Sequence, residues 1–169
     1  MQLERDLHLA TRMRQPLSLI MIDLDNFKDI NDRSGHGTGD LALQNVAESL
    51  KQELRAVDSA ARFGGDEFAI ILPQANESGA LIVAERLRKR ISATQIRGYG
   101  RVTASIGLAS FPIHASSRDL LVVAADRALY ESKRKGRNRI SSASVEVHDF
   151  GYEEKPPVTV FVQPALSEN

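Results

Sequence analysis

Hydrophobic positions along the chain follow two patterns, short apolar runs and stripes with helical spacing. The run over residues 17–25 is almost wholly apolar and ends in acid, which predicts a strand buried on both faces with Asp23 and Asp25 at its carboxyl end. Helical patterns predict helices over residues 1–14, 27–33, 41–54, 80–91 and 117–135. Further strands are predicted over 60–63, 68–72, 101–111 and near 139, with a glycine-rich break over 34–40 and a loop over 73–78. This order predicts an α+β domain with one mixed, mostly antiparallel sheet flanked by helices.

The segment over residues 62–68, Arg-Phe-Gly-Gly-Asp-Glu-Phe, carries the strongest local signal. Two glycines between apolar stretches predict a tight hairpin turn, because glycine takes positive φ at little cost. The turn then displays two adjacent carboxylates, Asp66 and Glu67. Neighbouring carboxylates repel each other, and a hard divalent cation such as phosphate-bound Mg²⁺ removes that penalty.

Acidic residues at the end of the buried strand supply a second part of the same pattern. Side chains alternate along a strand, so Asp23 and Asp25 are expected on one face and Leu24 on the other. A strand-end acid beside a hairpin-tip acid is typical of phosphoryl and nucleotidyl transferases that hold metal ions. An Asp-x-Asp alone also occurs as a strand terminator or helix cap, and its weight here comes from the segment over 62–68.

Composition sets broad limits on the function. The 169 residues suffice for one domain with a sizeable core. Basic and acidic residues number 22 each, so no bulk charge indicates a nucleic-acid or membrane partner. No apolar run reaches transmembrane length, no signal peptide is evident, and the lack of cysteine excludes disulfides and thiolate metal sites. We therefore expect a cytoplasmic domain that contacts neither nucleic acid nor membrane, although a full-length parent could be membrane-anchored.

From about residue 3 to about residue 140 the chain resembles the GGDEF domain, the diguanylate cyclase family. The matching motifs are Gly64-Gly65-Asp66-Glu67-Phe68, Asp23-Leu-Asp-Asn-Phe-Lys28-Asp-Ile-Asn31-Asp32, Gly35-His36-Gly-Thr-Gly39-Asp40, Ser105-Ile-Gly107, Ala125-Asp126-x-Ala128-Leu-Tyr130 and Lys133-x-x-Gly136-Arg137-Asn138. The resemblance implies a palm-like fold shared with nucleotide cyclases and polymerases. It also implies that two GTP molecules are condensed into cyclic di-GMP, with release of two pyrophosphates.

The resemblance assigns roles around the reacting atoms. A ribose 3′-hydroxyl attacks the α-phosphorus of a second GTP, assisted by Mg²⁺ or Mn²⁺. Asp23, Asp66 and the backbone carbonyl of Leu24 are the implied metal ligands. Asp66, with or without Glu67, is the candidate proton acceptor, and the sequence does not separate that role from metal binding. A purely structural interpretation makes Asp23 a solvated strand end and Asp66 part of a solvated turn.

Phosphate ligands are expected from two places. The helix beginning near Asn26 and Phe27 points free N–H groups at an anion, and Lys28 in its first turn opposes the helix dipole unless an anion is near. In the family this lysine stabilises transition-state charge. Lys133 and Arg137 match the remaining phosphate ligands. The structural alternative for that basic run is a favourable helix C-terminus beside a glycine.

Guanine recognition is implied for three residues. A carboxylate accepts guanine N1–H and N2–H₂ together, a donor pair that adenine lacks. By position Asp40 and Asn31 are the family's guanine ligands, with His36 nearby. As alternatives, Asp40 caps a helix starting at residue 41, Asn31 ends its own helix, and His36 serves only loop hydrogen bonding.

Regulation is implied by Arg55-Ala-Val-Asp58, which has the spacing of the family's inhibitory site, with Arg62 as a further contributor. Arginine can bond guanine O6 and N7 while aspartate takes N1–H and N2–H₂, so bound cyclic di-GMP would limit its own synthesis. An exposed ion pair is the simpler interpretation. Each domain holds one GTP, so the resemblance also implies a C2 homodimer, either lasting or transient.

The chain departs from the family at both ends. The usual opening motif, Asp-x-Leu-Thr, is absent, so we expect residues 1–141 to be an N-terminally truncated GGDEF domain whose upstream sensory domain is missing. Residues 142–169 hold five acids and one lysine, a net charge of −4, and are expected to be extended or disordered. The main alternative function is a weak or silent module that acts as a receptor for cyclic di-GMP or GTP.

Overall fold

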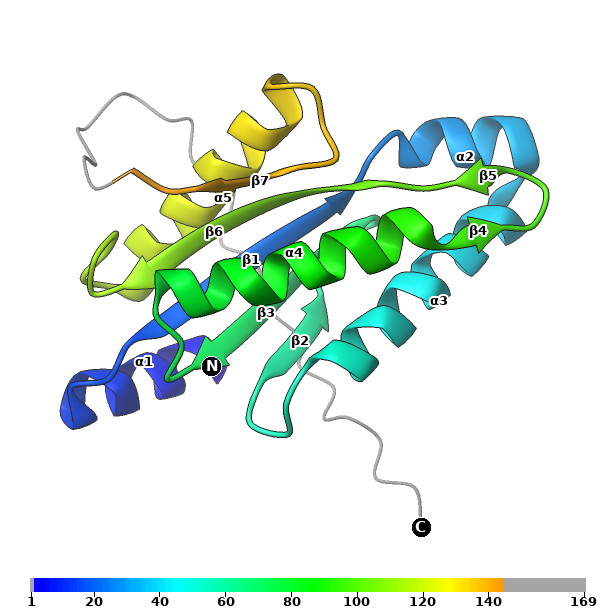
Figure 1. Cartoon of the computed structure of the whole chain (residues 1–169). Helices are drawn as coiled ribbons and strands as arrows, with labels where there is room; N and C mark the ends of the chain where they lie inside the picture. The colour runs from blue at the N-terminus through cyan, green and yellow to red at the C-terminus, as the bar shows by residue number, and fades with distance from the viewer. Residues whose placement is uncertain (1, 145–169) are drawn as a thin grey trace, which may run out of the picture.

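The computed structural model describes residues 2–144 (Figure 1). Its helices are α1 Gln2–Met13, α2 Phe27–Ser34, α3 His36–Glu53, α4 Glu77–Ala93 and α5 Arg118–Arg134. Its strands are β1 Leu17–Leu24, β2 Ser59–Arg62, β3 Glu67–Pro73, β4 Gln95–Ile96, β5 Gly100–Arg101, β6 Ala104–Phe111 and β7 Ile140–Ser142.

Strand β1 is the centre of a five-stranded sheet with the order β2-β3-β1-β6-β7. Neighbouring strands are antiparallel except β6 and β7, which are parallel. All eight residues of β1 are buried, as its apolar sequence predicts. The predicted α+β fold with a mixed, mostly antiparallel sheet is therefore confirmed.

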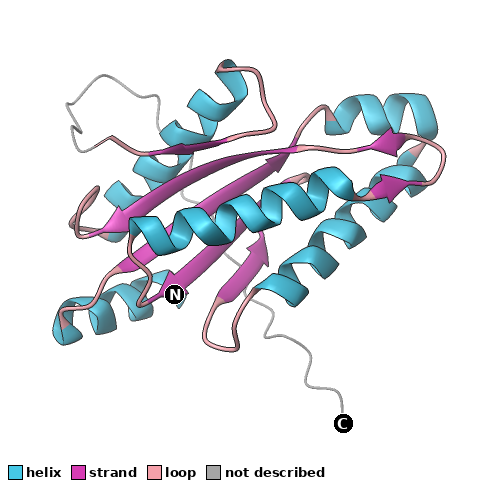
Figure 2. Ribbon diagram, viewed as in Figure 1, coloured by secondary structure: helices cyan, strands magenta, loops and turns pink. Residues whose placement is uncertain are grey.

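Helices cover both faces of this sheet (Figure 2). Alternate residues of β1 enter two different cores because strand side chains alternate between faces. Ile20 and Ile22 belong to a core with residues of α2, α3 and α4. Leu19 and Met21 belong to a second core with residues of α1 and α5. The sheet is thus the middle layer of three.

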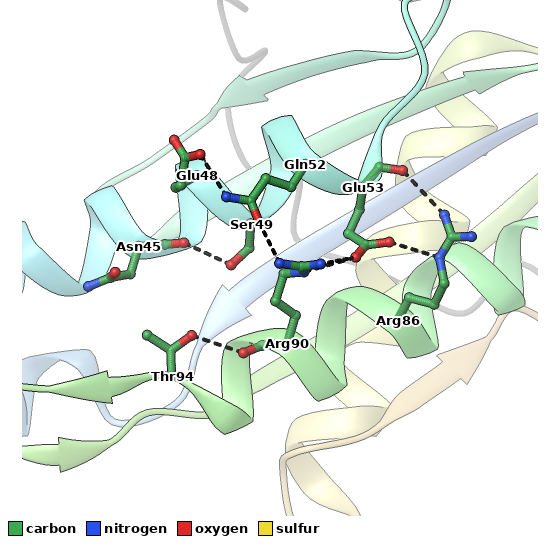
Figure 3. A network of polar contacts seen from close by, with 8 residues as sticks. All are labelled: Asn45, Glu48, Ser49, Gln52, Glu53, Arg86, Arg90 and Thr94. Carbon is green, nitrogen blue, oxygen red and sulfur yellow. Dashed lines mark hydrogen bonds and ion pairs between the residues drawn. The ribbon is translucent and has the colours of Figure 1, made fainter.

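A polar network ties the end of α3 to α4 (Figure 3). The carboxylate of Glu53 lies 2.9 Å from Nε of Arg86 and 2.8 Å from Nε of Arg90. Arg86 also donates to the backbone carbonyl of Glu53, and Arg90 donates to the side chain of Gln52. Because the carboxylate is mostly buried and shared by two guanidinium groups, this network fixes the two helices more firmly than an isolated surface pair would.

Three predicted boundaries are wrong. The break over 34–40 is shorter than predicted, because α3 already begins at His36 and only Gly35, with φ of 79°, separates it from α2. The loop predicted over 73–78 ends earlier, because Asn76 caps α4 by accepting a hydrogen bond from the N–H of Gly79 at 2.9 Å. The strand predicted over 101–111 is divided, since its first part pairs with β4 in a separate two-stranded ribbon.

Strand β7 crosses the boundary predicted at residue 141. Most of the predicted acidic extension, from residue 145 onwards, lies outside the described residues, so its conformation stays a prediction. Among the described residues, no helix combines the length and apolar character needed to cross a membrane.

Gly107 on β6 allows α5 to approach the sheet. A Cβ atom there would lie 2.2 Å from both the carbonyl oxygen of Ala125 and the backbone nitrogen of Leu129. Gly107→Ala should therefore lower the free energy of unfolding by about 1–3 kcal/mol through overpacking, measured by urea denaturation. Gly37→Ala is the matched control, because a Cβ atom at Gly37 meets nothing within 4 Å. Equal unfolding midpoints for the two variants would contradict this account of the close approach.

Candidate active site

Three carboxylates meet at the carboxyl end of β1. The register places Asp23 directly opposite Glu67 on β3, and directly opposite residues in an antiparallel pair share one face of the sheet. The N–H of Leu24 donates to the carbonyl of Asp66 at 3.2 Å, which brings Asp66 beside the same strand end. Like charges placed directly opposite are destabilising, so packing alone does not favour this arrangement.

The glycine turn is built differently from the sequence-based prediction. Neither Gly64 nor Gly65 has a positive φ, so that part of the prediction is wrong. A Cβ atom at Gly64 would lie 2.7 Å from Oε2 of Glu67, so a larger residue there would displace the end of the Glu67 side chain. The guanidinium group of Arg62 donates to the carbonyl of Gly64 at 3.2 Å and to that of Gly65 at 2.5 Å. Arg62, which the resemblance assigns to the inhibitory site, thus braces the turn.

Lys133 reaches this strand end from α5. Its Nζ lies 2.6 Å from Oδ2 of Asp23, although the two residues are 110 positions apart. Burial raises the pKa of the Asp23 carboxyl above its ordinary value, the hydrogen bond and charge of Lys133 lower it, and the charges of Asp66 and Glu67 raise it. The net shift is upward, so the folded protein favours the ionised form of Asp23 less than the unfolded chain does.

The carboxylates at the end of β1 suit a metal cation that takes its remaining ligands from water and phosphate. Among the described residues, no group of three His, Cys, Asp or Glu side chains is arranged to hold a metal ion by itself. Mg²⁺ usually takes one or two protein carboxylates and fills its remaining positions with water and phosphate oxygens. Asp23 and Asp66 meet that requirement, and a cation would offset the burial and, to a lesser extent, the repulsion from Asp66 and Glu67 that raise the pKa of Asp23.

Helix α2 begins directly after the acidic strand end. Its N-cap, Asn26, has a left-handed φ of 56° and makes no side-chain capping bond. The first-turn N–H groups of the helix, near Phe27 and Lys28, therefore receive no acceptor from the cap side chain. Lys28 is exposed and Phe27 is half-buried. The predicted helix start is confirmed.

The candidate guanine ligands lie where α2 and α3 touch. A Cβ atom at Gly39 would lie 2.1 Å from Oδ1 of Asn31, so this glycine lets the Asn31 side chain rest on α3. Asp40 is the next residue, exposed and inside α3, and His36 is the exposed first residue of the helix. The capping interpretation of Asp40 is therefore wrong, and so is the interpretation that Asn31 ends its helix, because α2 continues to Ser34.

Arg55 and Asp58 form a direct ion pair with each other, away from this site. Nη2 of Arg55 lies 2.8 Å from Oδ1 of Asp58, and the same nitrogen donates to the carbonyl of Pro73 at 3.2 Å. The hydrogen bond to Asp58 raises the pKa of Arg55 above its ordinary value. Pro73 pairs with Leu17 at the start of β1, so the ion pair and the acidic cluster lie at opposite ends of a strand of roughly 23 Å. The ion pair expected as the simpler alternative is present, but it is exposed only on the arginine side, because the Asp58 side chain is 1% exposed.

Arg137 lies in the short loop between α5 and β7, four positions after Lys133. Its N–H donates to the carbonyl of Ser132 at 3.0 Å, and its φ is 61°. The neighbouring residue, Asn138, donates its N–H to the carboxylate of Asp25 at 3.0 Å. Sequence reasoning missed this contact, and no local pattern signals it, since 113 positions separate the two residues.

The raised pKa of Asp23 predicts a stability cost at neutral pH. A raised folded-state pKa stabilises the fold below the unfolded value, near 3.8, and that contribution is lost as pH rises through the folded-state pKa. Asp23→Asn should therefore raise the urea midpoint at pH 7 with EDTA present, and the gain should vanish in acid. Asp119→Asn, at an exposed carboxylate, is the control and should change little. A lower midpoint for Asp23→Asn at every pH would contradict the prediction.

Comparisons with known proteins agree with this architecture. The family described as "Diguanylate cyclase, GGDEF domain" matches residues 1–139. Diguanylate cyclase A of Treponema denticola is 45% identical over 131 residues, which cover 76% of this chain and 35% of that protein. Diguanylate cyclase DosC of Escherichia coli K12 is 41% identical over 141 residues, which cover 81% of this chain and 30% of that protein. The chain thus spans about a third of the length of these relatives.

Solved structures show the same fold. The active GGEEF domain of a diguanylate cyclase from Vibrio cholerae matches with a TM-score of 0.81 and 33% identity, over 85% of this chain and 92% of that one. The GGDEF domain of DgcB from Caulobacter crescentus, solved in complex with c-di-GMP, matches with a TM-score of 0.78 and 34% identity, over 83% and 85%. With a palm-like α+β fold and a family match over most of its length, this chain belongs to the GGDEF domain family of diguanylate cyclases.

Proposed function

We propose that this chain is the catalytic domain of a diguanylate cyclase, which condenses two GTP into cyclic di-GMP and releases two pyrophosphates. The observation that carries the proposal is the cluster of Asp23, Asp66 and Glu67 with Lys133 at the carboxyl end of β1. The intact Gly-Gly-Asp-Glu-Phe segment and the relatives named diguanylate cyclases support it.

Asp23, Asp66 and the backbone carbonyl of Leu24 are the residues that would hold Mg²⁺ or Mn²⁺. When bound, the metal neutralises phosphate charge and lowers the pKa of the attacking hydroxyl. Asp66, with or without Glu67, would accept the proton of the ribose 3′-hydroxyl.

Phosphate binding falls to α2 and α5. The uncapped N-terminus of α2 at Asn26 and Phe27 offers backbone N–H groups to an anion, and the exposed Lys28 adds charge. Lys133 has three donor hydrogens, so it can keep Asp23 and still bind a phosphate oxygen. Arg137 would bind the same phosphates from the α5–β7 loop.

The base is read where α2 meets α3. Asp40 would accept guanine N1–H and N2–H₂, Asn31 would add a further hydrogen bond, and His36 would lie beside them. Adenine lacks the donor pair, so these ligands would select GTP over ATP. The close contact of Asn31 with Gly39 supports the proposal, because it fixes one base ligand next to the other.

Two copies of the domain would act together. One domain holds one GTP, so each 3′-hydroxyl reaches the α-phosphate of the other GTP only when two domains face each other in a C2 homodimer. Arg55 and Asp58, with Arg62 as a further candidate, would form a product-binding site on another part of the surface. Because Arg55 is bonded to Asp58 already, a bound guanine would have to replace those bonds.

Turnover of GTP tests the proposal. With Mg²⁺ and rising protein concentration, cyclic di-GMP should form at a rate that rises faster than linearly, and fusion to a dimeric coiled coil should increase it. Asp66→Ala should lower the rate by roughly 100-fold or more, because it removes both a metal ligand and the proton acceptor. Asp119→Ala, at an exposed carboxylate on α5, is the matched control.

Two results would contradict the proposal that this chain is an enzyme. One is an unchanged rate in Asp66→Ala. The other is a silent coiled-coil fusion that still binds cyclic di-GMP, which would instead support the receptor alternative.

Product inhibition is tested by Arg55→Ala. Removing the guanidinium group should raise the cyclic di-GMP concentration for half-inhibition by about tenfold or more, because a charged, bidentate contact is lost. The control is Arg118→Ala, which breaks another arginine–aspartate ion pair, that with the exposed carboxylate of Asp119. Half-inhibition at the same concentration in Arg55→Ala and in the unmodified chain would remove this site from the proposal.

A further inference from the structure

The loop between α5 and β7 adopts an unusual backbone conformation. Gly136, Arg137 and Asn138 have φ values of 113°, 61° and 46°, so three consecutive residues lie at positive φ. L residues other than glycine rarely adopt this region, and such a conformation persists only where surrounding contacts enforce it. The loop therefore requires anchors outside itself.

Asp25 supplies the first anchor. Its buried carboxylate accepts hydrogen bonds from Oγ1 of Thr103 at 2.6 Å, Oγ of Ser105 at 2.6 Å and the N–H of Asn138 at 3.0 Å. Bonds to an ionised carboxylate are among the stronger ones in proteins. A carboxylate has about four acceptor positions, and three are already used by the protein itself.

Arg88 on α4 supplies the second anchor. Its Nη1 lies 2.8 Å from Oδ1 of Asn138 and 3.3 Å from the carbonyl oxygen of the same residue. Its other nitrogens bond Glu85 at 2.8 Å, which holds the guanidinium group in place. Asn138 is thus held at its N–H by Asp25 and at its side chain and carbonyl by Arg88.

We infer that Asp25 is a positioning residue that holds the α5–β7 loop so that Arg137 faces the nucleotide phosphates. Arg137 directly precedes the anchored residue, Asn138. Asp25 follows Asp23 by two positions, and the two residues have different roles. Asp23 would bind the metal, and Asp25 would set the position of the phosphate-binding Arg137. The inference rests on the proposed function, in which Arg137 is a phosphate ligand.

The competing role for Asp25 is a second metal ligand. The two roles predict different kinetics. A metal ligand changes the Mg²⁺ concentration needed at saturating GTP, whereas a positioning residue changes the affinity for GTP through Arg137. The effects of two residues that act through one contact are not additive, which gives a second criterion.

The experiment measures KM for GTP, kcat and the half-saturating Mg²⁺ concentration for Asp25→Asn, Arg137→Ala and the double variant, in the coiled-coil fusion. Asp25→Asn keeps the size of the side chain but replaces one acceptor oxygen with a donor. We expect KM to rise about tenfold in each single variant, with the double variant no worse than about twofold beyond either. The half-saturating Mg²⁺ concentration should stay unchanged, and Asp119→Asn should change none of these values.

Arg88→Met gives an independent arm if Asp25→Asn does not fold. It removes the second anchor of Asn138 and leaves the buried carboxylate intact. KM should rise several-fold in Arg88→Met. In the double variant with Arg137→Ala, the two increases in KM should again not multiply.

Three outcomes would overturn the inference. The first is that the increases in KM caused by Asp25→Asn and Arg137→Ala multiply in the double variant. Where Asp25→Asn does not fold, the same result for Arg88→Met and Arg137→Ala overturns the inference. The second is a raised Mg²⁺ requirement with an unchanged KM. The third is a chain that neither binds nor turns over GTP, which overturns the proposed function itself and the inference with it.

Discussion

Burial of two carboxylates at the carboxyl end of β1 is the constraint on which the rest of the structure depends. A buried charge is costly unless it is paired or hydrogen-bonded, so each carboxylate dictates what must lie around it. Asp23 is met by Lys133 from α5, and Asp25 is met by two hydroxyl groups near the start of β6 and by the α5–β7 loop. The central strand thus determines where α5 and its loop must sit.

The clustered carboxylates at the end of β1 are unfavourable for stability, while the proposed function requires them. The pKa of Asp23 is raised by burial and by the charges of Asp66 and Glu67, which is unfavourable for the protein alone. The surrounding framework tolerates that cost because two apolar cores cover the sheet and the network around Glu53 joins α3 to α4. In the proposed function, metal-bound triphosphate would supply a cation and an anion together at this site.

Much of this architecture follows from local sequence. The apolar run of β1 and the stripes of the long helices predict the layers, and the motif residues predict the strand end and the turn. Contacts between distant segments could not be predicted from local patterns. Gly39 reads as part of a break, yet it lies in α3, where a Cβ atom would collide with the side chain of Asn31. The opposition of Asp23 and Glu67 depends on register. The bonds from Asn138 to Asp25 and from Lys133 to Asp23 join residues more than a hundred positions apart.

A crystal structure of the domain with Mg²⁺ and a non-hydrolysable GTP analogue tests the central claim most directly. The account predicts that the triphosphate lies between the N-terminus of α2 and the pair Lys133 and Arg137. Mg²⁺ should contact Asp23 and Asp66, and Asp25 should keep its bond to Asn138. A triphosphate bound elsewhere, or a metal ion held by Asp25 with the α5–β7 loop displaced, would contradict it.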